Sequence, residues 1–214
     1  MIPYIDLTNK PSKYFKTVHQ SIDRVLKHGN YIGGQEVYNF ETKMGSYLKN
    51  NKFAGVANGT AALFLALKYF NIGPGDEVIT TPLSYLASTS SIALTGAKPV
   101  LCDIDDTLCL DINSVKNSIN RKTKAILLVH LYGNIGSVKE ISKLCKENHI
   151  YLIEDCAQSH GATYKGKKAG SIGDVGCFSF YPTKIFGAYG DGGFITTNNE
   201  QLHDKIKRIR FLGM

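Results

Sequence analysis

The sequence predicts an α/β fold, a three-layer α/β/α arrangement around a mostly parallel sheet of about seven strands. Three observations lead to this prediction. Short apolar runs alternate with helical stretches along most of the chain. Several runs, such as AILLVH and YLIED, are apolar along most of their length, which is typical of strands covered on both faces. Strands that alternate with helices are expected to be parallel and joined by right-handed crossovers.

The expected elements follow one another in a regular order. The strands cover residues 53–57, 77–81, 99–104, 125–130, 151–155, 175–181 and 194–197. Helical patterns cover residues 60–70 and 138–148 between them, and a charged helix covers residues 200–210. Two further helical segments, 12–26 and 37–48, precede the first strand. We therefore expect a helical arm over residues 1–50 and a sheet domain over residues 51–214.

The composition is that of an ordinary globular protein with a substantial core, since 43% of the 214 residues are hydrophobic and 20% are charged. No apolar run is long enough to cross a bilayer, and residues 1–6 lack the order of a signal peptide. The five cysteines are dispersed without a C-x-x-C pair, which favours free thiols in a reducing compartment. These features predict a cytoplasmic protein without a membrane segment.

Metal and nucleic-acid binding are not expected. His130, His149 and His160 lack the spacing of zinc ligands. The net charge is +7, but the basic residues are spread along the chain instead of forming a stripe with aromatic residues. A protein that handles anionic small molecules explains this charge equally well.

Ligands of open α/β sheets lie beyond the carboxyl ends of the strands, so the residues there are candidates for a functional site. After the strand 53–57 the chain reads Asn58-Gly59-Thr60. Asn58 is a good N-cap, Gly59 lets the backbone approach a ligand, and Thr60 offers a hydroxyl at a helix N-terminus, which together suit an anion. A merely well-capped helix explains the same three residues.

A second strand end carries a carboxylate. Asp155 ends the strand 151–155, where an unpaired buried charge would be costly. It either caps the following turn or holds a heterocyclic nitrogen protonated. Nearby His160 is expected to be a structural hydrogen-bonding residue and not a catalyst.

Lys184 lies in FSFYPTKIFGAYG, the most apolar loop of the chain. Either its stem lies along apolar surface while the ammonium reaches water, or its amine is desolvated and nucleophilic. In the second interpretation Phe180, Tyr181, Ile185 and Phe186 form an apolar wall around it. The glycines that follow lead into a strand and do not open a helix, which argues against a dinucleotide-binding fingerprint.

One cofactor accounts for this set of residues. Pyridoxal 5′-phosphate (PLP) needs a lysine for its aldehyde, an acidic partner for its pyridine nitrogen and donors for its phosphate. Lys184, Asp155 and the segment Asn58-Gly59-Thr60 supply the three in turn, and Ser179 lies on the same segment as Lys184.

Longer segments resemble a known family. The segments are NGTAALFLAL, GPGDEVITTPLSYLASTSSIALTGAKPVLCDID, LLVHLYG and IEDCAQSHGATYKGKKAGSIGDVGCFSFYPTKIFGAYGDGGFITTN. They closely resemble the DegT/StrS-type sugar aminotransferases, which are PLP enzymes of fold type I, the aspartate-aminotransferase fold. The resemblance runs from Ile2 to Arg210. It implies that the chain is the large domain, and that the smaller C-terminal domain of the family is missing.

The resemblance implies two catalytic residues. Lys184 matches the lysine that binds the cofactor's aldehyde covalently, and Asp155 matches the carboxylate that pairs with the pyridine nitrogen. Some relatives carry histidine in place of the lysine and are dehydratases or radical enzymes, so Lys184 argues against that branch.

The resemblance also implies further cofactor-binding residues. Gln158 matches a glutamine near the ring and its phenolic oxygen. Tyr85 falls where the family places an aromatic residue stacked on the ring. Ser179, together with Gly59 and Thr60, matches the phosphate ligands.

The function implied by the resemblance is amino transfer in nucleotide-sugar biosynthesis that leads to lipopolysaccharide or another polysaccharide. The amino group would pass from a donor, expected to be glutamate, to a nucleotide-linked keto-deoxysugar at C3 or C4. A homodimer is implied, or a separately encoded C-terminal half. The alternative is a truncated paralogue that binds PLP or a partner without catalysis.

Overall fold

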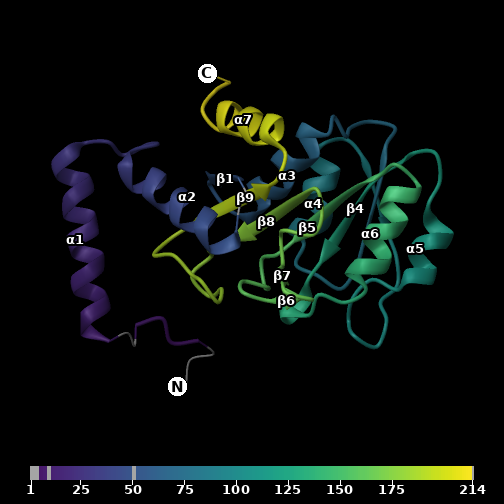
Figure 1. The fold of residues 1–214 in the computed structure, drawn as a ribbon, viewed down its shortest axis with the longest axis horizontal. Helices are drawn as coiled ribbons and strands as arrows, with labels where there is room; N and C mark the ends of the chain where they lie inside the picture. The colour runs from purple at the N-terminus through teal and green to yellow at the C-terminus, as the bar shows by residue number, and fades with distance from the viewer. Residues whose placement is uncertain (1–4, 9–10, 50–51, 214) are drawn as a thin grey trace.

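The computed structural model describes residues 5–8, 11–49 and 52–213, and a seven-stranded sheet lies at its centre (Figure 1). The strands of this sheet are β1 (Lys52–Val56), β2 (Glu77–Thr80), β3 (Lys98–Leu101), β4 (Thr123–Val129), β5 (Tyr151–Asp155), β8 (Val175–Ser179) and β9 (Gly193–Thr197). The helices are α1 (Ser12–His28), α2 (Gln35–Leu48), α3 (Gly59–Tyr69), α4 (Ala87–Leu94), α5 (Ile112–Ser118), α6 (Val138–Glu147) and α7 (Glu200–Ile209), with a 3-10 turn η1 (Leu131–Gly133). A separate hairpin consists of β6 (Thr163–Tyr164) and β7 (Lys167–Lys168).

The strand order β1-β9-β8-β5-β4-β2-β3 determines which loops meet. β8, β5, β4, β2 and β3 are parallel, whereas β9 runs antiparallel to both of its neighbours, β8 and β1. β1 therefore points in the same direction as the parallel strands. The carboxyl ends of β1, β8, β5, β4 and β2 consequently lie along one edge of the sheet.

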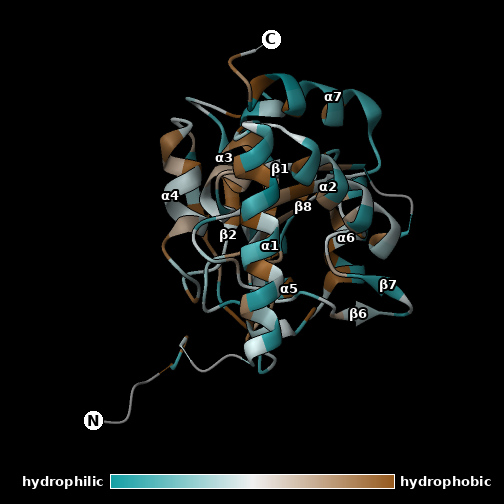
Figure 2. Ribbon diagram, turned by 90° about the vertical axis from the view of Figure 1, so that its left-hand side faces the viewer, coloured by the Kyte–Doolittle hydropathy of each residue, from teal (hydrophilic) through white to brown (hydrophobic). Residues whose placement is uncertain are grey.

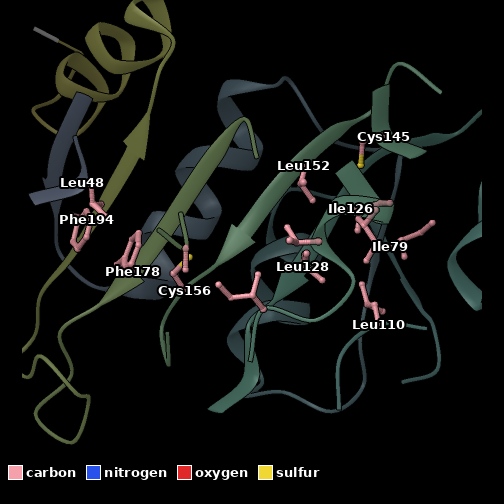
Figure 3. Packing of buried hydrophobic residues seen from close by; sticks show 14 of the residues in the cluster. Leu48, Ile79, Leu110, Ile126, Leu128, Cys145, Leu152, Cys156, Phe178 and Phe194 are labelled. Carbon is pink, nitrogen blue, oxygen red and sulfur yellow. The ribbon is translucent and has the colours of Figure 1, made fainter. Parts of the chain in front are cut away.

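Helices cover both faces of the sheet, which confirms the predicted three-layer α/β/α fold. α3, α4 and α7 pack on one face, and α2, α5 and α6 pack on the other. Hydrophobic residues gather on the strands and on the inner sides of the helices, while much of α7 is hydrophilic (Figure 2). The core on the α2, α5 and α6 side includes the stacked rings of Phe178 and Phe194, whose centroids lie 4.2 Å apart (Figure 3).

The two helices of the predicted arm differ in their packing. α1 stands away from the sheet and has no buried residue, whereas α2 buries Met44 and Leu48 in the core (Figure 1). Glu41 of α2 is also buried, and it accepts hydrogen bonds from the Gly55 N–H of edge strand β1 and from Arg210. Arg210 also donates to the Gly55 carbonyl, 2.9 Å away. Two side chains thus cover the free edge of β1 at Gly55.

The proposed division into an arm of residues 1–50 and a domain of residues 51–214 remains a prediction. Residues 50 and 51 lie outside the described residues, as do residues 1–4 of the predicted start of the chain. In the part of the chain that the structure describes, no helix combines the length and apolarity needed to cross a membrane.

Two strands end more than one residue before the predicted end. β3 ends at Leu101 and not at residue 104, because the N–H of Asp103 turns away from the sheet to bond the Ser114 hydroxyl at 3.0 Å. β8 ends at Ser179 and not at residue 181. Phe180 N–H still bonds the Gly192 carbonyl in register with the β8–β9 pairing, but the Phe180 carbonyl accepts from the Ala188 N–H, so the chain leaves the sheet there. The helices α4 and α5 and the β6–β7 hairpin were not predicted.

Candidate functional site

A cavity of about 460 Å³ opens at the edge where the parallel strands end. Loops after β1, β2, β5 and β8 line it, because these strands point in the same direction. All of the predicted catalytic and cofactor-binding residues border this cavity: Gly59, Thr60, Tyr85, Asp155, Gln158, Ser179 and Lys184. The structure therefore brings together residues that are far apart in the chain.

The first turn of α3 forms one wall. The Asn58 side chain accepts a hydrogen bond from the Ala61 N–H at 2.8 Å, so the predicted N-cap is confirmed. The N–H groups of Gly59 and Thr60 precede the first bonds within the helix, and helix dipoles favour anions at such an end. Gly59 lies so close to Ser179 that a Cβ at position 59 would be 2.7 Å from the Ser179 Cβ. Because Gly59 has no side chain, the start of α3 can lie this close to the end of β8.

Asp155 supplies the carboxylate of the cavity. It is only 6% exposed, and its Oδ1 accepts a hydrogen bond from the Ala157 N–H at 3.1 Å. Its Oδ2 accepts a hydrogen bond from the Ser88 hydroxyl at 2.9 Å. Burial raises the pKa of Asp155, while these two donors and the charges of His130 and Lys184 act in the opposite direction. A cationic ligand atom in the cavity would favour the ionised carboxylate in the same way.

Two serines that the sequence did not indicate extend this arrangement. Ser88 lies in α4 and is fully buried, and its Oγ lies 2.8 Å from the Oγ of Ser84. Ser84 lines the cavity and precedes α4 in the chain. The segment PLSYLASTSSIAL has too many serines and too little periodicity to indicate a helix, so the contact of Ser88 with Asp155 was not foreseeable.

Gln158 is held with a defined orientation. Its Oε1 accepts a hydrogen bond from the Tyr132 N–H at 3.0 Å, which leaves its amide N–H₂ as the end that can donate. Tyr132 lies in the turn η1 and has a φ of 53°, a left-handed conformation that is costly for an aromatic residue. The strained turn thus delivers the N–H that orients Gln158.

Lys184 lies in the loop between β8 and β9. Hydrogen bonds from Phe180 N to Gly192 O and from Ala188 N to Phe180 O close this loop at 2.7 and 2.8 Å. Lys184 is half-buried and lines the cavity beside Asp155 and Thr183. The amine therefore lies on the wall of the cavity, held by a loop that is closed at its base.

The predicted apolar wall around Lys184 is wrong. Of its four apolar neighbours in the sequence only Phe180 is buried, while Tyr181, Ile185 and Phe186 are 54%, 73% and 50% exposed. Tyr181 still lines the cavity, and Phe186 packs against the rings of Phe180 and His160. Asp155, Thr183 and Asp191 line the same cavity as Lys184, so its surroundings there include polar side chains.

His160 lies beneath the same loop among aromatic rings. Its ring centroid lies 5.4 Å from that of Phe178 and 5.8 Å from that of Phe180. Neither ring nitrogen has a hydrogen-bond partner among the described residues, so the expectation of a structural hydrogen-bonding residue is wrong. Burial, together with the charge of Lys184, lowers the pKa of His160 from 6.5 to about 4.

Behind the cavity, on the other side of β5, Glu154 and His130 form a buried pair. Glu154 Oε2 lies 2.8 Å from His130 Nε2, and the carboxylate also accepts the N–H groups of Gly170, Ile172 and Gly173. Burial raises the pKa of Glu154, but the hydrogen bond and charge of His130 outweigh it, so the pKa is lowered. The Glu154 carboxylate fixes the end of β5, directly beside Asp155.

The residues present fit PLP. The N-terminus of α3 beside Ser179 suits a phosphate, because a helix N-terminus attracts anions. Gly59 carries no side chain at this point, so a ligand can approach the backbone. A protonated ring nitrogen suits the buried Asp155 carboxylate, and an aldehyde suits the amine of Lys184 in the same cavity. Tyr85 is 74% exposed at the cavity rim, where its ring is open to contact.

Known proteins with similar sequences include nucleotide-sugar aminotransferases. The chain is 45% identical over its full length to the dTDP-3-amino-3,6-dideoxy-alpha-D-galactopyranose transaminase of Aneurinibacillus thermoaerophilus. It is 42% identical over 98% of its length to the UDP-2-acetamido-2-deoxy-3-oxo-D-glucuronate aminotransferase of Pseudomonas aeruginosa. The fold matches the crystal structure of DesV from S. venezuelae over the whole chain, with a TM-score of 0.95 and 37% identity.

The chain spans only part of these relatives, namely 59% and 58% of the two enzymes and 58% of DesV. Residues 14–214 match the DegT/DnrJ/EryC1/StrS aminotransferase family. This match extends over nearly the whole chain and includes every residue of the cavity described above. The chain therefore belongs to the DegT/DnrJ/EryC1/StrS aminotransferase family.

Proposed function

We propose that this chain is the cofactor-binding part of a PLP-dependent sugar aminotransferase. One observation carries the proposal: Lys184, Asp155 and the N-terminus of α3 face a single cavity. The relatives support the substrate class, since both of the named enzymes act on nucleotide-linked sugars. We infer that a nucleotide-linked keto-deoxysugar receives an amino group that an amino acid, expected to be glutamate, donates.

When bound, PLP supplies an electron-accepting ring that stabilises negative charge at the α-carbon of an amino acid. Asp155 would hold the ring nitrogen protonated through its negative charge. Gly59, Thr60 and Ser179 would bind the phosphate, and Gln158 would donate its amide N–H to the phenolic oxygen. Lys184 would hold the aldehyde, and its Nζ would accept the proton from the α-carbon of the amino donor. Tyr85 would contact the ring from the rim of the cavity.

The position of the new amine is proposed to be C3. Support comes from the two named relatives, whose names specify a 3-amino and a 3-oxo sugar. A substrate with its ketone at C4 is the alternative. Offering 3-keto and 4-keto nucleotide sugars in parallel, with detection of the aminated product by mass spectrometry, separates the two.

A second copy of the chain, or a separately encoded C-terminal half, is proposed to complete the site in the cytoplasm. Support comes from the exposed aromatic residues that line the cavity, Tyr85 and Tyr181, at 74% and 54%. Large exposed apolar surface of this kind marks a contact with another protein surface.

Reconstitution with PLP tests the proposal. The wild-type chain should acquire visible absorbance that borohydride converts into a stable adduct on Lys184, mapped by peptide mass spectrometry. Lys184→Ala should lose the adduct, whereas Lys146→Ala, which removes an exposed lysine of α6, should keep it. Absence of the adduct in the wild type rejects the proposal. An adduct whose spectrum glutamate leaves unchanged instead supports the non-catalytic PLP-binding module.

A further inference from the structure

Three oxygen-bearing side chains form a continuous hydrogen-bonded line whose two ends, Ser84 and Asp155, both line the cavity, and whose middle member, Ser88, is buried behind it. Ser84 lines the cavity, its Oγ lies 2.8 Å from Ser88 Oγ, and Ser88 Oγ lies 2.9 Å from Asp155 Oδ2. Ser88 has no exposed surface, and Asp155 is 6% exposed. The hydroxyl of Ser88 therefore has no access to solvent, and its partners in the described structure are these two side chains and no others.

The protonation state of Asp155 determines which side chain donates each hydrogen bond of this line. An ionised carboxylate only accepts hydrogen bonds, so Ser88 must give its single proton to Asp155. Ser88 Oγ then accepts from Ser84, which leaves the lone pairs of Ser84 Oγ for the cavity. When Asp155 is protonated both hydroxyls can reverse, and Ser84 then donates into the cavity. The two arrangements of the hydroxyl groups differ only in whether Asp155 carries a proton. Each serine carries one hydroxyl proton in both.

We propose that Ser84 and Ser88 are positioning residues that form a two-hydroxyl relay, which orients the Asp155 carboxylate and gives it, beside its own face on the cavity, a second route for exchanging a proton with the cavity. In transfer, a donor in the cavity gives a proton to Ser84 Oγ, Ser84 passes its own to Ser88, and Ser88 passes its own to Asp155 Oδ2. Each hydroxyl ends with one proton, so the step balances. The role assigned to the cavity rests on the proposed function, whereas the geometry of the line does not.

Ser91 offers a matched control. It lies on the same helix and is as fully buried as Ser88, but its hydroxyl donates to the Ser88 backbone carbonyl at 3.3 Å and does not contact Asp155. Ser91→Ala therefore removes a buried hydroxyl of α4 and leaves the line intact. Ser88→Thr keeps the hydroxyl while adding a methyl group in a position with no free surface.

Other charged or titratable groups also act on Asp155. They are Lys184 from the β8–β9 loop, His130 at the end of β4, and the buried thiols of Cys156 and Cys177. All four are unchanged in the serine variants. A difference between the variants therefore reports the hydroxyls themselves.

The first measurement uses the chain without PLP, labelled with ¹³C at the aspartate side-chain carboxyl, and follows the Asp155 signal by NMR as the pH changes. The signal is assigned by its loss in Asp155→Asn. Ser88→Ala should move the titration midpoint upward by about one pH unit, because one charge-assisted hydrogen bond is lost. Ser84→Ala should move it by less, and Ser88→Thr and Ser91→Ala should leave it near the wild-type value.

The second measurement is PLP affinity from the visible absorbance. Ser88→Ala should weaken binding roughly tenfold, the effect of losing one hydrogen bond to a charged group, with Ser88→Thr restoring it. The relay is overturned if Ser88→Ala titrates and binds like the wild type, or if Ser88→Thr and Ser91→Ala are as impaired as Ser88→Ala. Failure of the proposed function gives a different result, because PLP then forms no Lys184 adduct even in the wild type.

Discussion

His130 Nε2 lies 2.8 Å from Glu154 Oε2 in the core, and neither side chain has any exposed surface. The pair joins the end of β4 to the residue that precedes Asp155 on β5, and Glu154 also binds three backbone N–H groups of the following glycine-containing loop. Replacing one member leaves the other buried without its charged partner. Such a change lowers the free energy of unfolding strongly.

Glu154→Gln should therefore lower the free energy of unfolding by about 3 kcal/mol. The amide keeps the shape of the side chain but replaces an oxygen acceptor with an N–H₂ group that faces donors. Urea denaturation followed by circular dichroism measures the change. Glu36→Gln, which breaks the exposed pair with Arg24, should cost less than about 1 kcal/mol. Equal effects of the two substitutions would contradict the importance of the buried pair.

Gly59→Ala should weaken PLP binding at least about tenfold, the cost expected of forcing one methyl group into a packed site. The added Cβ would lie 2.7 Å from the Ser179 Cβ, so α3 and the end of β8 must separate. Gly73→Ala is the control, because its Cβ would meet only the Thr95 carbonyl at an ordinary 3.5 Å. Absorbance titration with PLP measures both variants. Unchanged affinity in Gly59→Ala would show that this corner does not hold the phosphate.

The stability of the fold should fall as the pH falls from 6.5 towards 4, in part because of His160. Burial lowers the pKa of His160 to about 4, so between these values the unfolded chain takes up a proton that the folded chain does not. The contribution is fully present above pH 6.5 and is lost on acidification. Urea denaturation of the wild type and His160→Phe across this range measures it.

The His160→Phe variant places a ring among the phenylalanines that already surround position 160, and it should lose less stability on acidification than the wild type. His19→Gln, which removes an exposed histidine, is the matched control for the loss of one histidine. Parallel curves for the wild type and His160→Phe would refute the assignment to His160.

Arg210→Ala should cost about 2 kcal/mol, because Glu41 is 8% exposed and loses its hydrogen-bonded guanidinium partner, while Lys207 Nζ stays 3.6 Å from its Oε2. The N–H of Gly55 still binds Glu41, but the carbonyl of Gly55 loses its donor. Arg208→Ala, on the exposed side of α7, should change stability by less than about 0.5 kcal/mol. Hydrogen exchange at α2 adds a local measurement, and unchanged protection there in Arg210→Ala would argue against a stabilising role of the Glu41–Arg210 pair.

Much of the fold followed from the sequence for a simple reason. The central strands are buried on both faces, so β4 and β5 appear in the sequence as apolar runs that few other structures explain. The location of Asp155 and of Asn58-Gly59-Thr60 followed from the rule that ligands lie at strand carboxyl ends. The roles of these residues remain predictions.

Other features depend on contacts that a sequence does not display. Ser88 contacts Asp155 only because β2 and α4 bring it beside the end of β5. The exposure of Tyr181 and Ile185 depends on how the Lys184 loop closes. The apolar composition of the loop had predicted that these side chains would surround Lys184. The lack of partners for the His160 nitrogens likewise follows from three aromatic neighbours, two of them beyond β8.

The place of β1 at the edge of the sheet has a consequence for biosynthesis. β1 pairs with β9 and with no other strand, in a register that joins Lys52 to Thr197. The first strand of the sheet to leave the ribosome therefore waits for the last, on the order of ten seconds at ordinary rates of translation. Such non-local pairing also slows folding. A nascent chain that ends before Gly193 has no β9 to pair with β1, and the wall of the cavity that follows β1 is assembled only when synthesis of the sheet is complete.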